Sequence, residues 1–213
     1  MPIYRTVAGE YSAEFVEKRS RFIGHIAPAR TPDEAAAFIN AIRARHWDAT
    51  HNVYAWALRD GQQSRYSDDG EPQGTAGLPV LGVLQKSGLT DVVIVVTRYF
   101  GGILLGGGGL VRAYSHSAAL AVEGAQVLDM RLCKLFTVDS DYTLYGKISR
   151  MLPRFAIIQR SIEFGTSVVL TLAALPDDYD AFRRELIEAS SGEISPVIVG
   201  EEYLDFSTAG TTR

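Results

Sequence analysis

The sequence contains one cysteine, no long apolar run and little net charge. These features argue against a disulfide-bonded protein, a membrane-spanning protein and a generic polyanion-binding protein, respectively. Cys133 alone cannot form an internal disulfide, which is typical of proteins from a reducing cytosol. Its neighbours predict a strand, so we interpret it as a buried apolar residue rather than a nucleophile. No apolar run approaches the roughly 18–20 residues of a membrane-spanning helix, and the first residues lack the apolar core of a signal peptide. We therefore expect a cytoplasmic protein without a membrane partner.

The charges are evenly balanced, which argues against a generic polyanion-binding protein. Residues 1–131 carry 13 basic and 13 acidic side chains, and residues 132–213 carry 8 and 12. A domain that binds nucleic acid without selectivity usually has a strong basic excess. Any contact with nucleic acid must therefore come from a local patch.

Acidic residues are absent between Asp91 and Glu123, and this stretch contains the most informative feature of the chain. Six of the nine residues from Gly101 to Gly109 are glycine, so the backbone there can adopt positive φ and approach another molecule closely. A buried-strand pattern leads into the stretch, and a helix pattern begins near Leu110. A glycine-rich turn that leads into a helix N-terminus, without negative charge nearby, predicts an anion-binding site. Its predicted ligand-binding residues are Arg98, Gly101, Gly102, Gly106, Gly107, Gly108, Gly109 and Arg112.

This glycine-rich stretch matches neither of the common nucleotide-binding motifs. Gly101 and Gly106 have the separation of a P-loop, but Gly107 and Gly108 stand where Lys and Ser or Thr are required. The dinucleotide-binding fingerprint fails because Arg112 occupies the place of its third glycine. The alternative interpretation is that the glycines only form a tight crossing from strand to helix.

The segment from Ser67 to Gly77 supplies the negative charge that the glycine-rich stretch lacks. Three carboxylates fall within four residues and are followed by small residues, which suits a hard cation, although the spacing is not that of an EF-hand. The alternatives are a solvated acidic turn, or carboxylates that pair with Arg98 and Arg112. We predict that the two segments form one ligand site, together with a histidine at a strand entrance. The predicted residues in this half of the site are His51, Ser67, Asp68, Asp69, Glu71, Gly74 and Thr75.

A second basic feature is a predicted hairpin turn that contains Lys18, Arg19 and Arg21. We interpret it either as a solvated hairpin tip or as a phosphate-binding extension of the site, and we assign these three residues to nucleic-acid contact. His116 lies four residues after Arg112 and is therefore expected on the same helix face.

Hydrophobic periodicity and capping signals divide the chain into two α+β domains, residues 1–131 and 132–213. Thr31, Pro32 and Glu34 form a strong helix start, because they supply a cap, a favoured first residue and a capping box. The first domain is predicted to have strands over 11–17, 21–27, 53–59 and 92–99, with helices from 32, over 78–86 and over 110–123. The second is predicted to have strands over 134–142, 156–164, 167–175 and 193–200, with helices over 143–153 and 177–189. This βαββαβ order matches a ferredoxin-like sandwich, and we expect a frayed tail over 206–213.

Four motifs, in sequence order, resemble the YigZ/IMPACT family. They are Lys18-Arg19-Ser20-Arg21-Phe22, Ala49-Thr50-His51-Asn52, the acidic segment from Ser67 to Gly77, and the glycine-rich stretch from Arg98 to Gly106. The resemblance covers nearly the whole chain, because residues 132–213 look like the C-terminal domain of bacterial members. It implies a first domain of layered α/β type, similar to domain IV of elongation factor G, and a second domain similar to its domain V. One departure is Gly107, where members often have threonine.

The resemblance also implies a link to translational control. In eukaryotic relatives the shared domain lies beside an N-terminal module that binds a translational-control activator; this chain begins at the shared domain, so we do not carry that partner over. Our leading hypothesis is a monomeric regulator of translation that binds RNA or a ribosomal surface through the glycine-rich anion site. The competing hypothesis is a hydrolase or phosphotransfer-type enzyme for a small anionic substrate, in which Asp68, Asp69 and Glu71 hold a divalent metal or act as acid and base. A third hypothesis is a regulator that binds only proteins. We predict no cofactor outside the enzymatic alternative.

Overall fold

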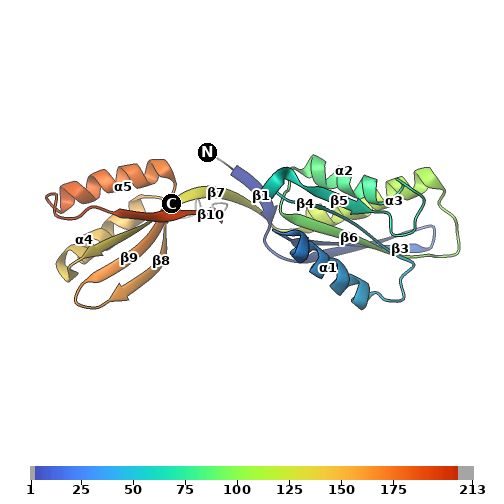
Figure 1. The fold of residues 1–213 in the computed structure, drawn as a ribbon, viewed down its shortest axis with the longest axis horizontal. Helices are drawn as coiled ribbons and strands as arrows, with labels where there is room; N and C mark the ends of the chain where they lie inside the picture. Colours follow the sequence, from blue (N-terminus) through green and yellow to red (C-terminus); the bar gives the residue numbers. More distant parts are fainter. Residues whose placement is uncertain (1–2, 206–213) are drawn as a thin grey trace. The chain divides into compact units, whose positions relative to one another are not determined.

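The computed structural model describes residues 3–205, and the tail expected over 206–213 lies outside these residues. The chain divides into two compact units, Tyr4–Leu128 and a second that begins at Asp129 (Figure 1). The expected boundary, between residues 131 and 132, lies slightly later in the sequence and inside a strand. Within the described residues, no helix combines the length and apolarity that crossing a membrane requires.

The first unit contains a five-stranded antiparallel sheet in the order β2-β3-β6-β4-β5. Its strands are β2 (Tyr11–Glu17), β3 (Ser20–Pro28), β4 (His51–Ala57), β5 (Ser64–Ser67) and β6 (Val92–Tyr99), and a short 3-10 helix, η1 (Asp60–Gln62), connects β4 to β5. β5 was not predicted, because its segment is too polar for a core. It is a mostly exposed edge strand that needs only its backbone to pair with β4.

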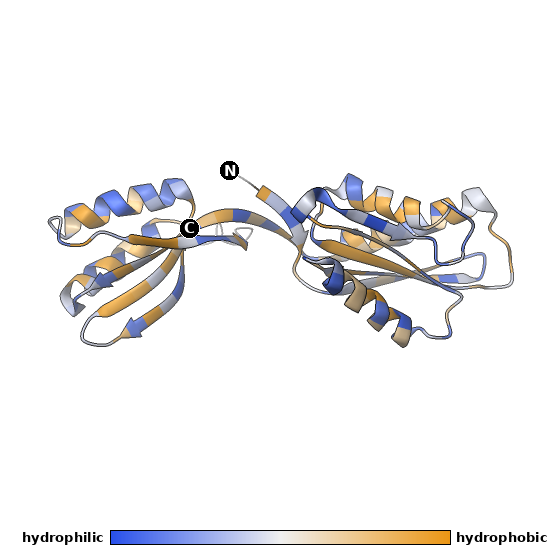
Figure 2. Ribbon diagram, viewed as in Figure 1, coloured by the Kyte–Doolittle hydropathy of each residue, from blue (hydrophilic) through white to orange (hydrophobic). Residues whose placement is uncertain are grey.

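Helices cover both faces of this sheet, which explains the uninterrupted apolar run of β6. The helices are α1 (Pro32–Arg45) on one face, and α2 (Gly77–Ser87) and α3 (Gly107–Gly124) on the other (Figure 1). Side chains alternate along a strand, so Val92, Ile94 and Val96 pack with α2 and α3, whereas Val93 and Val95 pack with α1. Figure 2 shows β6 as a hydrophobic band between the two helical layers.

The predicted start of α1 is confirmed. Thr31 is the N-cap, and its side-chain oxygen accepts a hydrogen bond from the N–H of Glu34 at 3.1 Å. The Glu34 carboxylate accepts a hydrogen bond from the N–H of Arg30 at 2.7 Å, and Pro32 stands at the start of the helix. The cap therefore satisfies backbone donors that the helix itself leaves without partners.

α3 starts at Gly107, three residues before the predicted start at Leu110. Gly106 is the N-cap with a φ of +69°, and its carbonyl accepts the first helical hydrogen bond from the N–H of Leu110 at 2.9 Å. Gly107, Gly108 and Gly109 thus form the first turn of the helix and are not loop. The low helix propensity of glycine, about 1 kcal/mol per residue below alanine, hid this start in the sequence.

A close backbone contact joins α3 to the sheet at Gly24 in β3. A Cβ atom on Gly24 would lie 2.4 Å from the carbonyl oxygen of Ser117 in α3, far inside van der Waals contact. We therefore expect Gly24→Ala to lower the free energy of unfolding by about 2 kcal/mol, because the helix must move to admit the methyl group. Urea unfolding followed by circular dichroism measures this loss. Gly82→Ala is the matched control, since the space around that position on α2 is open; a loss below about 0.5 kcal/mol at Gly24 would contradict the contact.

The second unit follows the predicted βαββαβ order. Its elements are β7 (Val127–Ser140), α4 (Tyr142–Met151), η2 (Leu152–Arg154), β8 (Ile157–Phe164), β9 (Val168–Ala174), α5 (Pro176–Ala189) and β10 (Val197–Asp205). The strands lie in the order β10-β7-β9-β8, and every neighbouring pair is antiparallel. Phe136, Leu170, Leu172 and Phe182 are central to its core. A strand that the sequence did not predict, β1 (Ile3–Val7), lies mostly within the first unit and also pairs with β7.

The bounds of two strands in this unit differ from the prediction. β7 begins at Val127 rather than at residue 134, and β10 covers Val197–Asp205 rather than 193–200. Pro196 lies just before β10 and has no N–H to donate to a neighbouring strand, which favours a strand that starts after it. Cys133 lies in β7 and is 1% exposed, as expected for a buried residue, and burial raises the pKa of its thiol to about 11.

Candidate functional site: a pocket at the start of α3

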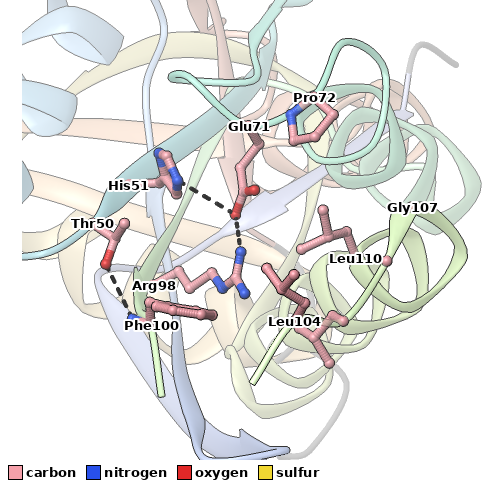
Figure 3. A pocket seen from close by; sticks show the side chains of 11 residues that line it. Thr50, His51, Glu71, Pro72, Arg98, Phe100, Leu104, Gly107 and Leu110 are labelled. Atoms are coloured by element: carbon pink, nitrogen blue, oxygen red, sulfur yellow. Dashed lines mark hydrogen bonds and ion pairs between the residues drawn. The ribbon is translucent and has the colours of Figure 1, made fainter. Parts of the chain in front are cut away.

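The acidic segment and the glycine-rich stretch line one pocket of about 390 Å³ in the first unit. It lies where β6 ends, between the loop that precedes α2 and the first turn of α3 (Figure 3). The polar side chains that line it are Thr50, His51, Glu71 and Arg98; Pro72, Phe100, Leu104, Leu105 and Leu110 are apolar, and Gly106 and Gly107 contribute backbone.

A buried ion pair closes the polar side of this pocket. Arg98 Nη1 donates a hydrogen bond to Glu71 Oε1 at 2.5 Å, and the two side chains are only 6% and 4% exposed. The hydroxyl of Tyr114, on α3, donates to the same oxygen at 2.7 Å. Burial, reinforced by the Glu71 carboxylate, raises the pKa of Tyr114 far above its ordinary value, so this hydroxyl stays a donor. His51 Nε2 lies 3.8 Å from the same Glu71 oxygen (Figure 3).

Strand register explains how a charged residue is held at the buried position of Arg98. Arg98 lies opposite Phe22 in β3 and opposite His51 in β4, so the three side chains share one face of the sheet. Its guanidinium carbon lies 5.4 Å from the ring centroid of Phe22 and 5.5 Å from that of Phe100. Nη2 donates to Ser20 Oγ at 3.4 Å, whereas the buried Nε has no hydrogen-bond partner among residues 3–205. The ion pair with Glu71 and the two aromatic rings therefore fix the guanidinium of Arg98, and Nε is its one donor without a partner among the described residues.

The N-terminus of α3 contributes to the pocket without a side-chain cap. In the part of the chain that the structure describes, no side chain accepts a hydrogen bond at this cap, and the first turn contains no acidic residue. The N–H groups of Gly107, Gly108 and Gly109 precede the first helical hydrogen bond, so the helix leaves them without partners. A Cβ on Gly107 would lie 3.9 Å from Thr75 Cγ2, so packing does not require glycine there. These donors and the helix dipole favour an anion at this position.

Asp68 organises the acidic loop and does not line the pocket. Its Oδ1 accepts hydrogen bonds from the N–H groups of Ala76 at 3.1 Å and Gly77 at 2.8 Å. Its Oδ2 accepts one from the N–H of Gly74 at 2.9 Å. These bonds place a carboxylate at the N-terminus of α2, where it interacts favourably with the helix dipole.

Asp69 fastens the same loop to the sheet and to α1. Its Oδ2 accepts a hydrogen bond from the N–H of Asn52 at 2.6 Å, and its Oδ1 accepts one from Arg43 Nη2 at 2.6 Å. Its carbonyl accepts a hydrogen bond from His51 Nδ1 at 2.7 Å, so that nitrogen carries a proton. Its own N–H donates to Ser67 Oγ at 3.2 Å. Among the described residues, no group of three or more His, Cys, Asp or Glu side chains is placed to hold a metal ion.

A second pocket, of about 240 Å³, lies next to the first, and one leucine lines both. Lys18, Arg112 and His116 line this cationic pocket, together with the single acidic residue Glu17. Arg112 follows Gly108 by about one helical turn, and its Nη1 lies 3.8 Å from the position of a Gly108 Cβ. Its guanidinium therefore lies beside the first turn of α3. Neither Lys18 nor Arg112 forms an ion pair within residues 3–205.

Arg21, the third basic residue of the predicted hairpin turn, forms an ion pair with Glu14. Arg21, on β3, donates from Nε and Nη2 to the two carboxylate oxygens of Glu14 on β2, at 2.8 Å each. This hydrogen bonding raises the pKa of Arg21 and lowers that of Glu14. Lys18 and Arg19 instead occupy the exposed two-residue turn, with φ values of +45° and +65°.

Gly101 is required by packing against this hairpin turn. A Cβ on Gly101 would lie 2.0 Å from the backbone of Arg19, and its N–H donates to Ser20 Oγ at 3.3 Å. Gly102 adopts a φ of +81°, which suits glycine. Gly101 and Gly102 therefore shape the end of β6 and do not line either pocket.

The structure brings some of the predicted site residues together and separates others. The first pocket contains His51, Glu71, Arg98, Gly106 and Gly107, and the second contains Lys18, Gly109 and Arg112. Gly108 lies between Gly107 and Gly109 on the first turn of α3 but lines neither pocket. The other predicted residues that line neither pocket are Arg19, Arg21, Ser67, Asp68, Asp69, Gly74, Thr75, Gly101 and Gly102. Functional candidates that the prediction did not assign are Thr50, Phe100, Leu104, Leu105 and Leu110, and the apolar residues inside the glycine-rich stretch were a signal for them.

Two domain families match the two units. Residues 18–122 match the Impact N-terminal domain, and residues 138–193 match a domain of unknown function, DUF1949. The IMPACT family member YvyE of Bacillus subtilis is 38% identical over 200 residues, which cover 93% of this chain and 91% of the relative. This chain belongs to the IMPACT family.

Other comparisons agree with a bacterial two-domain member of the IMPACT family. The IMPACT family member YigZ of Escherichia coli is 36% identical over 189 residues, which cover 86% of this chain and 92% of that protein. Protein IMPACT of Xenopus laevis is 34% identical over 94 residues, which cover 42% of this chain and 30% of the relative. A crystal structure described as that of a hypothetical protein shares 32% sequence identity, with a TM-score of 0.61, and covers 94% of this chain and 98% of that chain.

Proposed function

We propose that this IMPACT-family protein binds RNA, free or on a ribosomal surface, through the first turn of α3 and the two pockets beside it, and thereby regulates translation. The observation that carries this proposal is the N-terminus of α3, which has no side-chain cap, beside Lys18 and Arg112, which form no ion pair among the described residues. Phosphate groups bind favourably at helix N-termini, and lysine and arginine add electrostatic attraction to an RNA backbone. A patch of this kind is compatible with the formal net charge of −4, because the binding groups are local.

The fold and the family give further support. The strand order β10-β7-β9-β8 of the second unit is that of a ferredoxin-like sandwich. We propose that the second unit corresponds to domain V of elongation factor G, and the first unit to its domain IV. The match to the Impact N-terminal domain links the first unit to translational control. Because a shared fold alone does not assign a function, the proposal rests on the pocket.

We expect Gly107→Asp to lower the affinity for single-stranded RNA by about tenfold or more while preserving the fold. The new carboxylate would occupy the anion position and repel a phosphate, yet acidic residues stabilise helix N-termini by about 0.3–1 kcal/mol. The affinity for a short fluorescent RNA, measured by anisotropy at two salt concentrations, tests this expectation. Wild-type binding is expected to weaken steeply as salt rises, because phosphate neutralisation releases counterions.

Gly107→Asn is the matched control, because its side chain has nearly the same shape but no charge. We expect it to retain most of the wild-type affinity. RNA binding by Gly107→Asp at the wild-type level would exclude this pocket as the RNA site. A wild-type protein without salt-dependent affinity for RNA would contradict the proposed function itself.

A further inference from the structure

Two pockets of different chemistry flank the first turn of α3. The larger pocket is mainly apolar, and Phe100 and Leu104 are among its lining residues. The smaller pocket has two cations, Lys18 and Arg112, against one carboxylate, Glu17, and Leu105 lines both pockets. Gly107 lines the larger pocket and Gly109 the smaller one, so the N–H groups of this turn lie between an apolar and a cationic pocket.

We infer that the RNA is single-stranded and places one unpaired base in the apolar pocket, with the adjacent phosphate at the N-terminus of α3. The next phosphate of the strand then lies toward Arg112 and Lys18. This inference rests on the proposed function and specifies the class of RNA that the site accepts.

The apolar pocket suits a base better than a phosphate. The charges inside it, on Arg98 and Glu71, already neutralise each other, so a phosphate there would lose hydration without gaining a counter-charge. Phe100 is 45% exposed and Leu104 is 82% exposed, which leaves their surfaces available to a flat, weakly polar ring. Stacking of bases on aromatic side chains is the usual way in which proteins hold single strands.

The size of the larger pocket agrees with a single base. A volume of about 390 Å³ lies near the lower end of the range of about 300–1,000 Å³ for small-molecule sites.

The first turn of α3 and the cationic pocket suit the backbone of the strand. Gly108 carries no side chain, so a phosphate can approach its N–H closely, and Arg112 lies beside it. Lys18 and His116 line the same pocket and can contact a second phosphate. Double-stranded RNA cannot use this arrangement, because its bases are paired and stacked inside the helix.

Binding of one fluorescent RNA strand, alone and annealed to its complement, tests the inference. We expect the duplex to bind at least about tenfold more weakly than the free strand to the wild-type protein. Phe100→Ala should lower the single-strand affinity by about 5- to 100-fold with little change in the salt dependence, because it removes stacking and no charge. Arg112→Gln should weaken both RNA forms and lower the slope of log affinity against log salt by about 0.7–1. Phe164→Ala is the matched aromatic control, since it removes a ring that is 60% exposed on the second unit.

Each outcome separates the inference from the proposed function. Preference for the single strand, together with its loss in Phe100→Ala, would support the inference. Equal binding of duplex and single strand, or an unchanged affinity in a folded Phe100→Ala variant, would overturn it and leave RNA binding itself intact. Failure of the wild-type protein to bind either RNA form would remove the proposed function, and the inference with it.

Discussion

Arg98→Ala is expected to lower the free energy of unfolding by about 3–5 kcal/mol, because it leaves the Glu71 carboxylate buried without a counter-charge. The Glu71 side chain is 4% exposed, and Arg98 is its cationic partner at 2.5 Å. Truncation also removes the guanidinium that packs against Phe22. Urea unfolding followed by circular dichroism at neutral pH measures the loss.

A double variant, Arg98→Met with Glu71→Leu, is the control for this expectation. It removes both charges together, and apolar replacement of a buried ion pair is often neutral or stabilising. We therefore expect the double variant to be more stable than Arg98→Ala, and a double-mutant cycle to show strong coupling between the two positions. A loss of less than about 1 kcal/mol in Arg98→Ala would show that the pair is more hydrated than its burial indicates.

This stability effect decides which residues are suitable for binding experiments. A change at Arg98 alters the fold and the pocket together, so lost RNA binding in such a variant would have two explanations. Gly107 and Arg112 are better positions, because one has room for a side chain and the other is exposed without an ion pair among the described residues. The RNA experiments above therefore use these positions.

Between pH 6.5 and pH 4 the protein is expected to lose about 3 kcal/mol of stability through His25. Burial, followed by the charges of His46 and Arg45, lowers the pKa of His25 in the folded state to about 4 from an ordinary value of 6.5. In this window the unfolded chain binds more protons than the folded protein. The free energy of unfolding therefore falls as the pH falls, by about 1.4 kcal/mol per pH unit, and the contribution of His25 is fully present above pH 6.5.

The surroundings of His25 explain why it resists protonation. It is 2% exposed; Nδ1 lies 2.8 Å from Ser12 Oγ, and Nε2 has no partner among residues 3–205. The ring of His46 lies 5.1 Å away, and burial lowers the pKa of His46 as well. Urea unfolding between pH 4.5 and pH 7.5 should give a weaker pH dependence for His25→Phe than for the wild type, with a remainder from His46. Identical pH dependence in the two proteins would refute the assignment to His25.

Local signals in the sequence predicted the elements that depend mainly on neighbouring residues. Thr31 and Pro32 predicted the start of α1, and the apolar run of β6 predicted a strand whose faces are both buried. β5 was missed because an edge strand can be polar and still pair through its backbone. The first turn of α3 was missed because three glycines disfavour a helix locally, and the packing of the rest of α3 overrides that preference.

The candidate site could be predicted only in part for a similar reason. Charge complementarity predicted that the glycine-rich stretch, with its arginines, lies against the acidic segment. The ion pair between Glu71 and Arg98 joins these two segments. Which carboxylate faces the arginine depends on the shape of the loop, including a φ of +46° at Asp69, and composition does not encode that shape. Phe100 and Leu104 were harder to assign to a site, because apolar residues are normally expected in a core and only the fold leaves these two exposed.

In the hairpin turn between β2 and β3, two cationic residues stand where other residues would make the fold more stable. Lys18 and Arg19 hold left-handed backbone angles that asparagine and glycine adopt far more easily, at a cost of about 1–2 kcal/mol for each residue. The two cations at this hairpin turn therefore lower the stability of the fold relative to residues that favour these backbone angles. A heat-adapted sequence with Asn-Gly at these positions would have a more stable turn and two fewer positive charges on this surface.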